Sequence, residues 1–425
     1  MINLAIIGAG IGGCSAAYFA SKYLPDSKIT IYEANDRVGG RVLTLEEGPL
    51  KLEMGANFFN PTNKTILGLV KDRGLRVRKL EESMDFAIWN GSEIIFKSNQ
   101  VAPLTMLKLL MRYKLNVSKM FFILKEATRL VKHLYEENWE NPSAVDELFE
   151  SIGLDKWYRK QFNSILNERG VDEAFIDDVV TPITRIIYSQ NADLGGFAGL
   201  TSIIGVYVGP LYNLADGNSV LPRSLAEASN SEVRLRQKVK NIEKTPDGSY
   251  RVSVGEKTSI FDGVVIAVPL ELAGLEFDGV SMRKWKPQQY KSVYTKVMRG
   301  FVDPRYFGLE ETRRLPPMIL TTAEANQITR FTIKQSANSE SLLIISSTEP
   351  LSDDVLYGVL KNGKTVLEHS WEAAYPAFKP TDRLPPFRLD ERLMYLNSIE
   401  SAASSMEASA FSALNAIKMM KREFR

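Results

Sequence analysis

The residues with the clearest chemical purpose stand near the start of the chain, where three glycines precede an acidic residue. Gly8, Gly10 and Gly13 have the spacing Gly-x-Gly-x-x-Gly, and Glu33 follows them. Glycines at these positions allow a tight turn, a close approach of backbone N–H groups to a pyrophosphate, and close packing of a helix on a strand. An acidic side chain about 20 residues further on can accept hydrogen bonds from ribose hydroxyls. This spacing predicts a dinucleotide-binding site.

The elements that must position this loop can be recognised on both sides of it. Residues 4–7 form a continuous apolar run, which is typical of a buried parallel strand. Residues 15–23 predict a helix, and a second strand over residues 28–32 would end next to the acidic residue. A loop between a strand and a helix places a pyrophosphate at the helix N-terminus. The neighbours expected to complete this part of the cofactor site are Ile11, Gly12 and Ala34.

A second glycine-rich segment favours FAD over NAD as the ligand. Gly40 and Arg41 follow the acidic residue closely, and a guanidinium can bind a pyrophosphate through paired, charge-assisted hydrogen bonds. A further glycine turn at Gly55, Ala56 and Asn57 stands where an isoalloxazine ring could lie. These residues resemble the Gly-Gly-Arg segment of the amine-oxidase and phytoene-desaturase flavoproteins. We therefore expect FAD as the cofactor.

Later segments predict the remaining elements around the nucleotide. Residues 220–228 predict a helix, and residues 232–242 alternate in polarity as a strand does. The resemblance to those flavoproteins implies that the backbone around Val239 lies against the adenine. Residues 262–269 predict a buried strand that returns the chain to the nucleotide-binding sheet.

The C-terminal segment predicts a last short strand over residues 393–397 and a helix over about residues 406–420. Alanine and serine on one face of this helix would permit close packing. A helix N-terminus at the pyrimidine side of the ring would stabilise the anionic reduced flavin through its dipole. Glu400 and Met406 are therefore expected next to the flavin.

Two long insertions predict a second domain above the flavin. The first is largely helical in pattern, and the second alternates in polarity as a sheet floor for a substrate pocket would. The predicted fold class is α/β, an FAD-binding, two-dinucleotide-binding (Rossmann-like) fold with an inserted α+β substrate domain. We expect the FAD-binding domain in residues 1–60, 205–270 and 385–425, and the substrate-binding domain in residues 61–204 and 271–384.

The first insertion carries apolar residues at helical spacing with basic residues among them. Leu104, Leu107 and Met111 form the apolar series, and Lys108 and Arg112 lie between them. One interpretation is an amphipathic helix that packs on a core. The other is a basic face that meets a membrane surface, so that a lipidic substrate can enter. The sequence leaves both open.

Composition excludes several other classes of function. The 425 residues have a net charge of +2 without a basic block, which gives no electrostatic case for nucleic acid. A single cysteine, Cys14, excludes a disulfide framework and a Cys-x-x-Cys redox pair. His133 and His369 are far apart, so we expect no metal site. Neither a signal peptide nor an apolar span is recognised, which predicts a cytoplasmic protein.

Three further segments resemble those of one family, the prenylcysteine oxidases. They are residues 181–190, with the pattern Pro-x-x-Arg-x-x-Tyr-x-Gln, residues 374–380, which begin Ala-Tyr-Pro, and residues 395–407. The resemblance covers nearly the whole chain and implies oxidation of an S-prenylcysteine to cysteine and a prenyl aldehyde. Hydride would pass from the carbon beside sulfur to flavin N5, and oxygen would be reduced to hydrogen peroxide. Tyr188 and Tyr375, within these segments, are candidate catalytic residues.

Lys296 departs from this family pattern. It stands where amine oxidases keep a lysine that holds a water near N5, which the prenylcysteine oxidases lack. Lys296 is therefore a third candidate catalytic residue, and its alternative role is that of an exposed lysine on a strand. Three functions remain open: a thioether oxidase, an amine oxidase or polyprenyl desaturase or isomerase, and a flavin-binding protein without turnover. A small hydrophobic substrate, molecular oxygen and a peripheral membrane contact are the expected partners.

Overall fold

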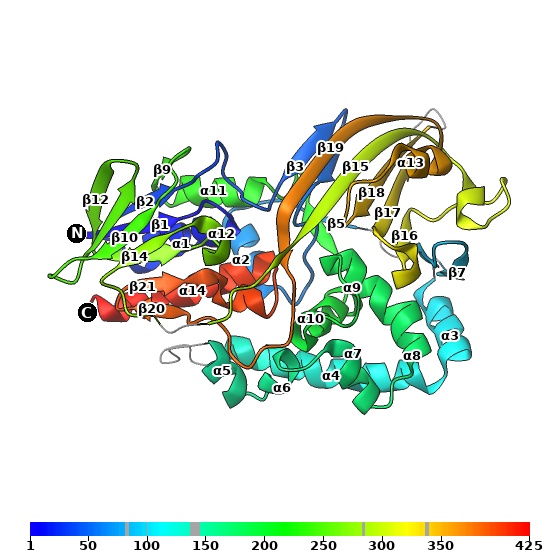
Figure 1. The fold of residues 1–425 in the computed structure, drawn as a ribbon, viewed down its shortest axis with the longest axis horizontal. Coiled ribbons are helices and arrows are strands. Elements are labelled where there is room, and N and C mark those ends of the chain that lie inside the picture. The colour runs from blue at the N-terminus through cyan, green and yellow to red at the C-terminus, as the bar shows by residue number, and fades with distance from the viewer. Residues whose placement is uncertain (81–84, 100, 137–144, 283–284, 336–339) are drawn as a thin grey trace.

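The computed structural model describes residues 1–80, 85–99, 101–136, 145–282, 285–335 and 340–425. Figure 1 shows two halves side by side. The terminal half, as we name it, carries both chain ends and is built around β1 and β2. The distal half has a large sheet above a group of helices, and the long strands β15 and β19 run from it toward the terminal half (Figure 1).

A six-stranded sheet forms the centre of the terminal half, in the order β20–β21–β13–β1–β2–β9. β1 pairs in parallel with β2 on one side and with β13 on the other. The three buried strands expected over residues 4–7, 28–32 and 262–269 are therefore neighbours, as a nucleotide-binding sheet requires. The strands are β1 (Ile2–Ile7), β2 (Ser27–Tyr32), β9 (Glu232–Arg234), β13 (Gly263–Ile266), β20 (Arg388–Asp390) and β21 (Leu393–Tyr395).

Burial on both faces explains why β1 has a continuous apolar sequence. Leu4 and Ile6 pack in the core shared with the helices, whereas Ala5 and Ile7 pack against a four-stranded sheet. The helices on the first face are α1 (Ile11–Tyr23), α2 (Lys64–Asp72), α11 (Val220–Ala228) and α14 (Met406–Glu423). The four-stranded sheet has the order β12 (Lys257–Phe261), β11 (Tyr250–Val254), β10 (Asn241–Lys244) and β14 (Glu276–Asp278).

The single strand expected over residues 232–242 is wrong, because two strands, β9 and β10, flank a loop. Residues 235–240 cross the end of β2, where the N–H of Gln237 donates to the carbonyl of Glu33 at 2.8 Å. The backbone of this loop therefore bonds to the end of β2, whereas a continuous strand would have bonded along a neighbouring strand. Val239 lies in the loop with its side chain only 3% exposed, in the core beneath the four-stranded sheet.

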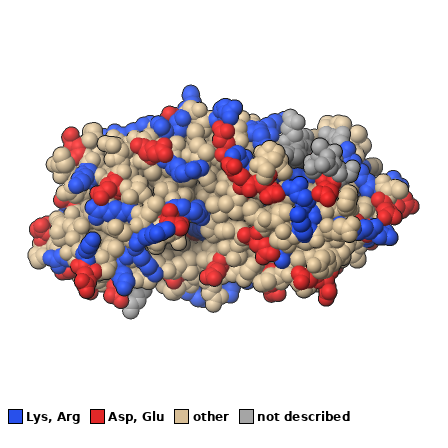
Figure 2. Space-filling view, turned by 90° about the horizontal axis from the view of Figure 1, so that it is seen from above, with Lys and Arg blue, Asp and Glu red and all other residues tan. Residues whose placement is uncertain are grey.

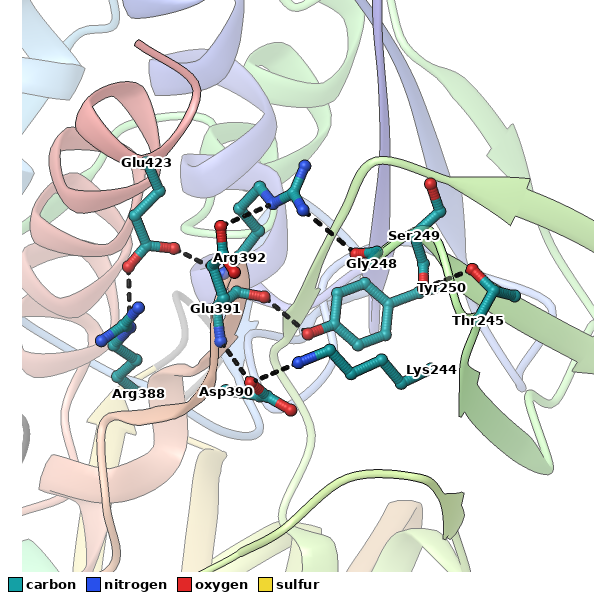
Figure 3. A network of polar contacts seen from close by, with 10 residues as sticks. All are labelled: Lys244, Thr245, Gly248, Ser249, Tyr250, Arg388, Asp390, Glu391, Arg392 and Glu423. Carbon is teal, nitrogen blue, oxygen red and sulfur yellow. Dashed lines mark hydrogen bonds and ion pairs between the residues drawn. The ribbon is translucent and has the colours of Figure 1, made fainter.

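A polar network joins the four-stranded sheet to the C-terminal segment (Figure 3). The Lys244 ammonium bonds Asp390 at 2.8 Å, and the Arg392 guanidinium donates to the carbonyl of Gly248 at 3.1 Å. The backbone N–H of Arg392 donates to Glu423 at the end of α14. These bonds tie the four-stranded sheet and the end of α14 to the segment that contains β20 and β21.

The distal half is built on a seven-stranded sheet in the order β19–β15–β18–β17–β16–β6–β7. Two of its strands, β6 and β7, come from the first insertion, which is therefore not helical throughout. Both are short, mostly apolar strands of four residues that complete the edge of the sheet. The strands are β6 (Phe86–Trp89), β7 (Ile94–Lys97), β15 (Tyr290–Val302), β16 (Met318–Thr321), β17 (Ile328–Gln335), β18 (Ser341–Ser347) and β19 (Leu360–Pro376).

Helices from the first insertion lie below this sheet (Figure 1). They are α3 (Ala102–Tyr113), α4 (Leu115–Glu136), α5 (Val145–Ser151), α6 (Asp155–Tyr158), α7 (Phe162–Glu168), α8 (Glu173–Phe175), a π-helical turn (Ile176–Val180), α9 (Thr181–Tyr188) and α10 (Gly196–Tyr207). The helical spacing noted near residue 104 is confirmed by α3. Across the residues that the structure describes, we find no helix whose length and apolar character would let it cross a membrane.

Short elements connect these parts. The strands are β3 (Thr44–Glu47), β4 (Leu50–Glu53), β5 (Val77–Lys79) and β8 (Tyr212–Leu214). The helices are α12 (Leu270–Ala273), α13 (Asp353–Val359) and the 3-10 helices Pro304–Phe307, Ala323–Ala325 and Leu396–Ser401. β4 leads directly into the glycine turn at residues 55–57, which places that turn between the two halves.

Candidate active site

A cavity of about 620 Å³ extends from the glycine loop of the terminal half to the sheet of the distal half. Its wall includes most of the residues expected around the cofactor, among them Gly8, Gly10, Ile11, Gly12, Glu33, Gly40, Arg41, Gly55, Ala56, Asn57 and Met406. Gly13, Ala34, Val239 and Glu400 were also expected and do not line it. The cavity therefore brings together segments from the start, the middle and the end of the chain.

The first and last glycines of the Gly-x-Gly-x-x-Gly loop have no room for a side chain. Gly8 has a φ of +102°, and a Cβ there would lie 2.5 Å from Val268 Cγ1. A Cβ on Gly13 would lie 1.9 Å from the carbonyl oxygen of Gly8. Gly40 approaches Gly10 so closely that its Cβ would be 3.0 Å from the Gly10 Cα. The tight turn and the close packing of helix on strand are thus both present.

The Glu33 carboxylate lies at the end of β2 and faces this loop. It accepts hydrogen bonds from the N–H of Ala9 at 2.8 Å and from the N–H of Asn35 at 2.9 Å. The side chain is buried, yet it lines the cavity. A carboxylate held in this way is oriented to accept hydrogen bonds from ribose hydroxyls.

Arg41 connects the two halves, because both ends of its guanidinium bond other segments of the protein. Its Nη1 donates to the carbonyl of Ala374 on β19 at 2.9 Å, and its Nη2 forms an ion pair with Glu400. Burial opposes the charge of this guanidinium, but Glu400, together with Tyr290 and Tyr375, more than offsets it, and the pKa of Arg41 is raised. Glu400 therefore acts behind the cavity wall, as the partner of a residue that lines it.

The glycine turn at residues 55–57 is held by side chains that the sequence did not single out. A Cβ on Gly55 would lie 2.0 Å from the carbonyl oxygen of Arg41. Trp371 Nε1 donates to the carbonyl of Met54 at 2.6 Å. Asn218 Nδ2 donates to the carbonyls of residues 56 and 57 at 2.9 and 3.0 Å. The backbone of the turn is thereby presented to the cavity.

The N-terminus of α14 closes another side of the cavity. Ser405 caps the helix by accepting from the N–H of Ala408 at 3.0 Å, and Met406 lines the wall beside it. The buried Glu407 carboxylate accepts from the N–H groups of Thr65 and Ile66, both at 2.9 Å, at the start of α2. The helix end expected near the flavin is thus anchored at the cavity.

The two most specific segments of the sequence meet in space. The ring of Tyr188 lies 5.3 Å from that of Tyr375 and 4.6 Å from that of Phe378, measured between centroids. Gln190 donates to the carbonyl of Pro376 at 3.0 Å and accepts from the N–H of Phe378 at 3.1 Å. Burial raises the pKa of both tyrosines, so their phenols stay neutral. They form an aromatic wall of the cavity.

Lys296 does not line the cavity, so the structure gives its expected role beside the flavin no support. Val293 and Thr295 on β15 line the wall, while the Lys296 ammonium pairs with Glu368 on β19 at 3.0 Å. Successive side chains of a strand point to opposite faces. Thr295 therefore lines the cavity at the place where Lys296 was expected, and Lys296, the next residue, points to the other face of the sheet.

Comparison with known proteins identifies the family. Residues 96–425 match the prenylcysteine lyase family, and residues 6–72 match the NAD(P)-binding Rossmann-like domain. The chain belongs to the prenylcysteine lyase family. Prenylcysteine oxidase 1 of Bos taurus is 26% identical over 97% of this chain and 87% of the relative. Farnesylcysteine lyase of Arabidopsis thaliana is 26% identical over 99% of this chain and 88% of the relative.

Solved structures show the same fold across the chain. A triple mutant of putrescine oxidase superimposes with a TM-score of 0.69 at 15% identity, covering 99% of each chain. A putative protoporphyrinogen oxidase from Exiguobacterium sp. 255-15 has a TM-score of 0.66 at 18% identity, also over 99% of each chain. The expected α/β fold of the amine-oxidase kind is confirmed.

This member of the prenylcysteine lyase family is an FAD-dependent oxidoreductase. The residues present fit the cofactor, because the crowded glycine loop leaves its backbone facing the cavity and Glu33 is fixed beside it. Gly55, Ala56 and Asn57 offer backbone to a flat ring further along the same cavity. Sequence reasoning missed Asn218 and Trp371, which are single polar or aromatic residues without a local pattern.

Arg185, the arginine of the Pro-x-x-Arg-x-x-Tyr-x-Gln pattern, has a structural role. Its guanidinium is buried and donates to Asn191 Oδ1 at 2.8 Å and to the carbonyl of Ile328 at 2.8 Å. It also donates to Thr321 Oγ1 at 3.1 Å and to the carbonyl of Asn326 at 2.6 Å. Burial lowers its pKa to about 10. These bonds fix α9, and with it Tyr188, against β16 and β17.

Proposed function

We propose that this enzyme oxidises the thioether of an S-prenylcysteine to cysteine and a prenyl aldehyde. The observation that carries the proposal is the meeting of the two family segments, at Tyr188 and Tyr375, in the wall of the cavity that begins at the glycine loop. The names of the relatives point to the same substrate class. A substrate in the distal end of this cavity would lie next to a flavin held at its other end.

The reaction requires few catalytic side chains, because the cofactor and water carry out its steps. When bound, the flavin supplies a hydride acceptor, and the carbon between sulfur and the alkene is the donor, since sulfur and the allyl group both stabilise the cation that forms. Water then adds to that carbon, and the hemithioacetal collapses to a thiol and an aldehyde. The two electrons pass to molecular oxygen, which takes up two protons and leaves as hydrogen peroxide.

The protein has to bind, orient and exclude water. Apolar side chains of Val131, Leu134 and Ile204 line the cavity and suit a prenyl chain, whose burial contributes about 0.8 kcal/mol per CH₂. Holding the reacting carbon in place can contribute about 7–11 kcal/mol in good cases. The neutral phenols of Tyr188 and Tyr375 bound this space without introducing a charge.

Oxidation of an amine is the competing function on this fold. The cavity wall in the distal half carries a guanidinium, that of Arg330, which would repel a cationic amine that has no carboxylate of its own. Lys296, the residue that suggested an amine oxidase, faces away from the cavity. Both observations favour the thioether.

Product analysis in air tests the proposal. FAD-loaded protein is incubated with S-farnesylcysteine, with putrescine and with cyclohexylamine, and peroxide, free thiol and aldehyde are measured. We expect equal amounts of the three products from the thioether and no peroxide from either amine. Peroxide from an amine, with none from the thioether, would overturn the proposal.

We propose further that the enzyme meets this lipidic substrate at an anionic membrane surface, through α3 and the start of α4. Large apolar side chains are exposed there, namely Leu104, Leu107, Met111, Leu115, Phe121 and Phe122, with 48 to 72% of their surface accessible. No acidic residue stands between Glu93 and Glu126, whereas Lys114 and Lys125 are exposed in that interval. Apolar and basic side chains together favour an anionic bilayer interface.

The position of this surface relative to the cavity supports its role. α4 begins in the exposed apolar region and continues to Val131 and Leu134, which line the cavity. Ten residues separate Phe121 from Val131, which is about 15 Å along a helix. The opposite face, seen from above in Figure 2, has acidic and basic side chains interspersed. A cytoplasmic location remains a prediction.

A further inference from the structure

Arg330 on β17 places a guanidinium in the cavity wall without an anionic partner. Its Nη2 donates to Ser346 Oγ at 3.1 Å, and its buried Nε makes no hydrogen bond. Among the residues that the structure describes, no carboxylate forms an ion pair with it. Burial lowers the pKa of this guanidinium, and Tyr375 is the neighbour that opposes the shift. A buried charge of this kind is costly unless an anion meets it.

The other arginines that line the cavity or lie behind it bond acceptors of the protein itself. Arg37, at the nucleotide end, donates to the carbonyls of Gly40 and Val42. Arg41 has the Glu400 carboxylate and the carbonyl of Ala374, and Arg185 has four neutral acceptors. Arg41 and Arg185 join segments that are distant in the sequence. Arg330 makes one bond to a serine on the neighbouring strand, so the other N–H donors of its two Nη groups are available to a ligand.

The location of Arg330 separates it from the nucleotide end of the cavity. Thr295 on β15 pairs with Ser346 on β18, and Ser346 pairs with Arg330 on β17. All three line the cavity and form a polar row across the sheet. Neighbouring strands lie about 4.8 Å apart, so the Cα of Arg330 is about 10 Å from that of Thr295. The row leads from β15, the neighbour of the edge strand β19, across β18 and β17 and into the distal half (Figure 1).

We propose that Arg330 binds the α-carboxylate of the substrate, an inference that rests on the proposed function. A guanidinium matches a carboxylate with two parallel, charge-assisted hydrogen bonds, and the two Nη groups of Arg330 keep N–H donors beyond the one that bonds Ser346. Ser346 supports the guanidinium through its hydroxyl. The cysteine end of an S-prenylcysteine would then lie on the polar row, while its prenyl chain occupies the apolar side near α4 and α10.

This arrangement makes the enzyme selective for a free carboxylate. A methyl ester has the same chain and the same reacting carbon, but it offers no negative charge to Arg330. The range for hydrogen bonds to a charged group corresponds to a preference of roughly 10- to 150-fold for the acid over the ester. The prenylated C-terminus of an intact, methylated protein would be rejected for the same reason.

The test uses S-dodecylcysteine and its methyl ester as probes. The saturated chain lacks the allylic carbon, so neither probe is oxidised, and binding is followed by the change in the flavin spectrum of the FAD-loaded protein. We expect the wild type to bind the acid roughly 10- to 150-fold more tightly than the ester. Arg330→Met should bind the acid as weakly as the ester, and Arg330→Lys should keep part of the preference.

Lys296→Met is the matched control, because it removes a cation from the same sheet on the face away from the cavity. It should leave the acid preference unchanged, and FAD content and melting temperature should be equal in all variants. Equal binding of acid and ester by the wild type would overturn the inference, as would an equal loss for both probes in Arg330→Met. Binding of the acid without oxidation of S-farnesylcysteine would instead overturn the proposed function and leave this inference standing.

Discussion

Glu53 ends β4 in the wall of the cavity, and its replacement by glutamine should remove a pH dependence from the stability of the fold. Its carboxyl accepts from the N–H of Asn218 and from Thr44 Oγ1, both at 2.9 Å. Burial nevertheless raises the pKa of Glu53 from 4.5 to about 7, because desolvation outweighs the two hydrogen bonds. The folded protein therefore retains a proton at this site that the unfolded chain has already released.

The sign of the effect follows from this difference. Between about pH 4.5 and pH 7 the folded state binds more protons than the unfolded state, so the free energy of unfolding decreases as the pH rises. The stabilisation is fully present below pH 4.5 and is lost as the pH rises through 7. The difference between 4.5 and about 7 corresponds to about 3 kcal/mol, at 1.36 kcal/mol per pKa unit.

Chemical denaturation between pH 4.5 and 8 measures this contribution. The difference in free energy of unfolding between wild type and Glu53→Gln should change by about 3 kcal/mol across that interval. Glu46→Gln, at an exposed carboxylate on the adjoining strand β3, is the matched control and should show no such change. A pH profile of Glu53→Gln that parallels the wild type would refute the argument, because it would show that the Glu53 carboxyl is solvated.

Three further changes test the cofactor loop and the membrane surface. Glu33→Ala should weaken FAD binding by roughly 1.5–3 kcal/mol, the range for bonds to a charged group, and an unaltered affinity in a fluorescence titration would contradict its placement. Gly13→Ala puts a Cβ 1.9 Å from the carbonyl oxygen of Gly8. It should destabilise the fold by roughly 1–3 kcal/mol in chemical denaturation, and unchanged stability would show that the contact relaxes. Replacing Phe121 and Phe122 by serine should abolish sedimentation with phosphatidylserine-containing vesicles, whereas Tyr357→Ser, an equally exposed aromatic on α13, should not. Equal sedimentation of both variants would refute the membrane surface.

The sequence predicts best where local backbone geometry dictates the residue. The glycine loop and Glu33 could be recognised because a tight turn, a close approach and a ribose partner each require one residue type. The helix expected over residues 220–228 is α11 with the same bounds, since its periodicity lies within one segment. Such features need no knowledge of distant contacts.

Features that depend on register or on distant partners could not be predicted in this way. Lys296 and Thr295 are adjacent, and a shift of one residue exchanges the face that meets the cavity. Arg330 is one of many arginines, and nothing near it in the sequence shows that it lacks a carboxylate, whereas Arg185 is satisfied by four acceptors. The strands β6 and β7 join a sheet whose other members follow some 190 residues or more later, so local pattern did not reveal them.

An anaerobic titration of the FAD-loaded enzyme with S-farnesylcysteine tests the central claim most directly. The flavin absorbance, the free thiol and the aldehyde are measured in the same sample, so that reduction of the cofactor is compared with cleavage of the thioether. We expect bleaching of the flavin with one thiol and one farnesal released per flavin, and no bleaching by putrescine at the same concentration. Bleaching by the amine alone, or thiol release without bleaching, would contradict the account.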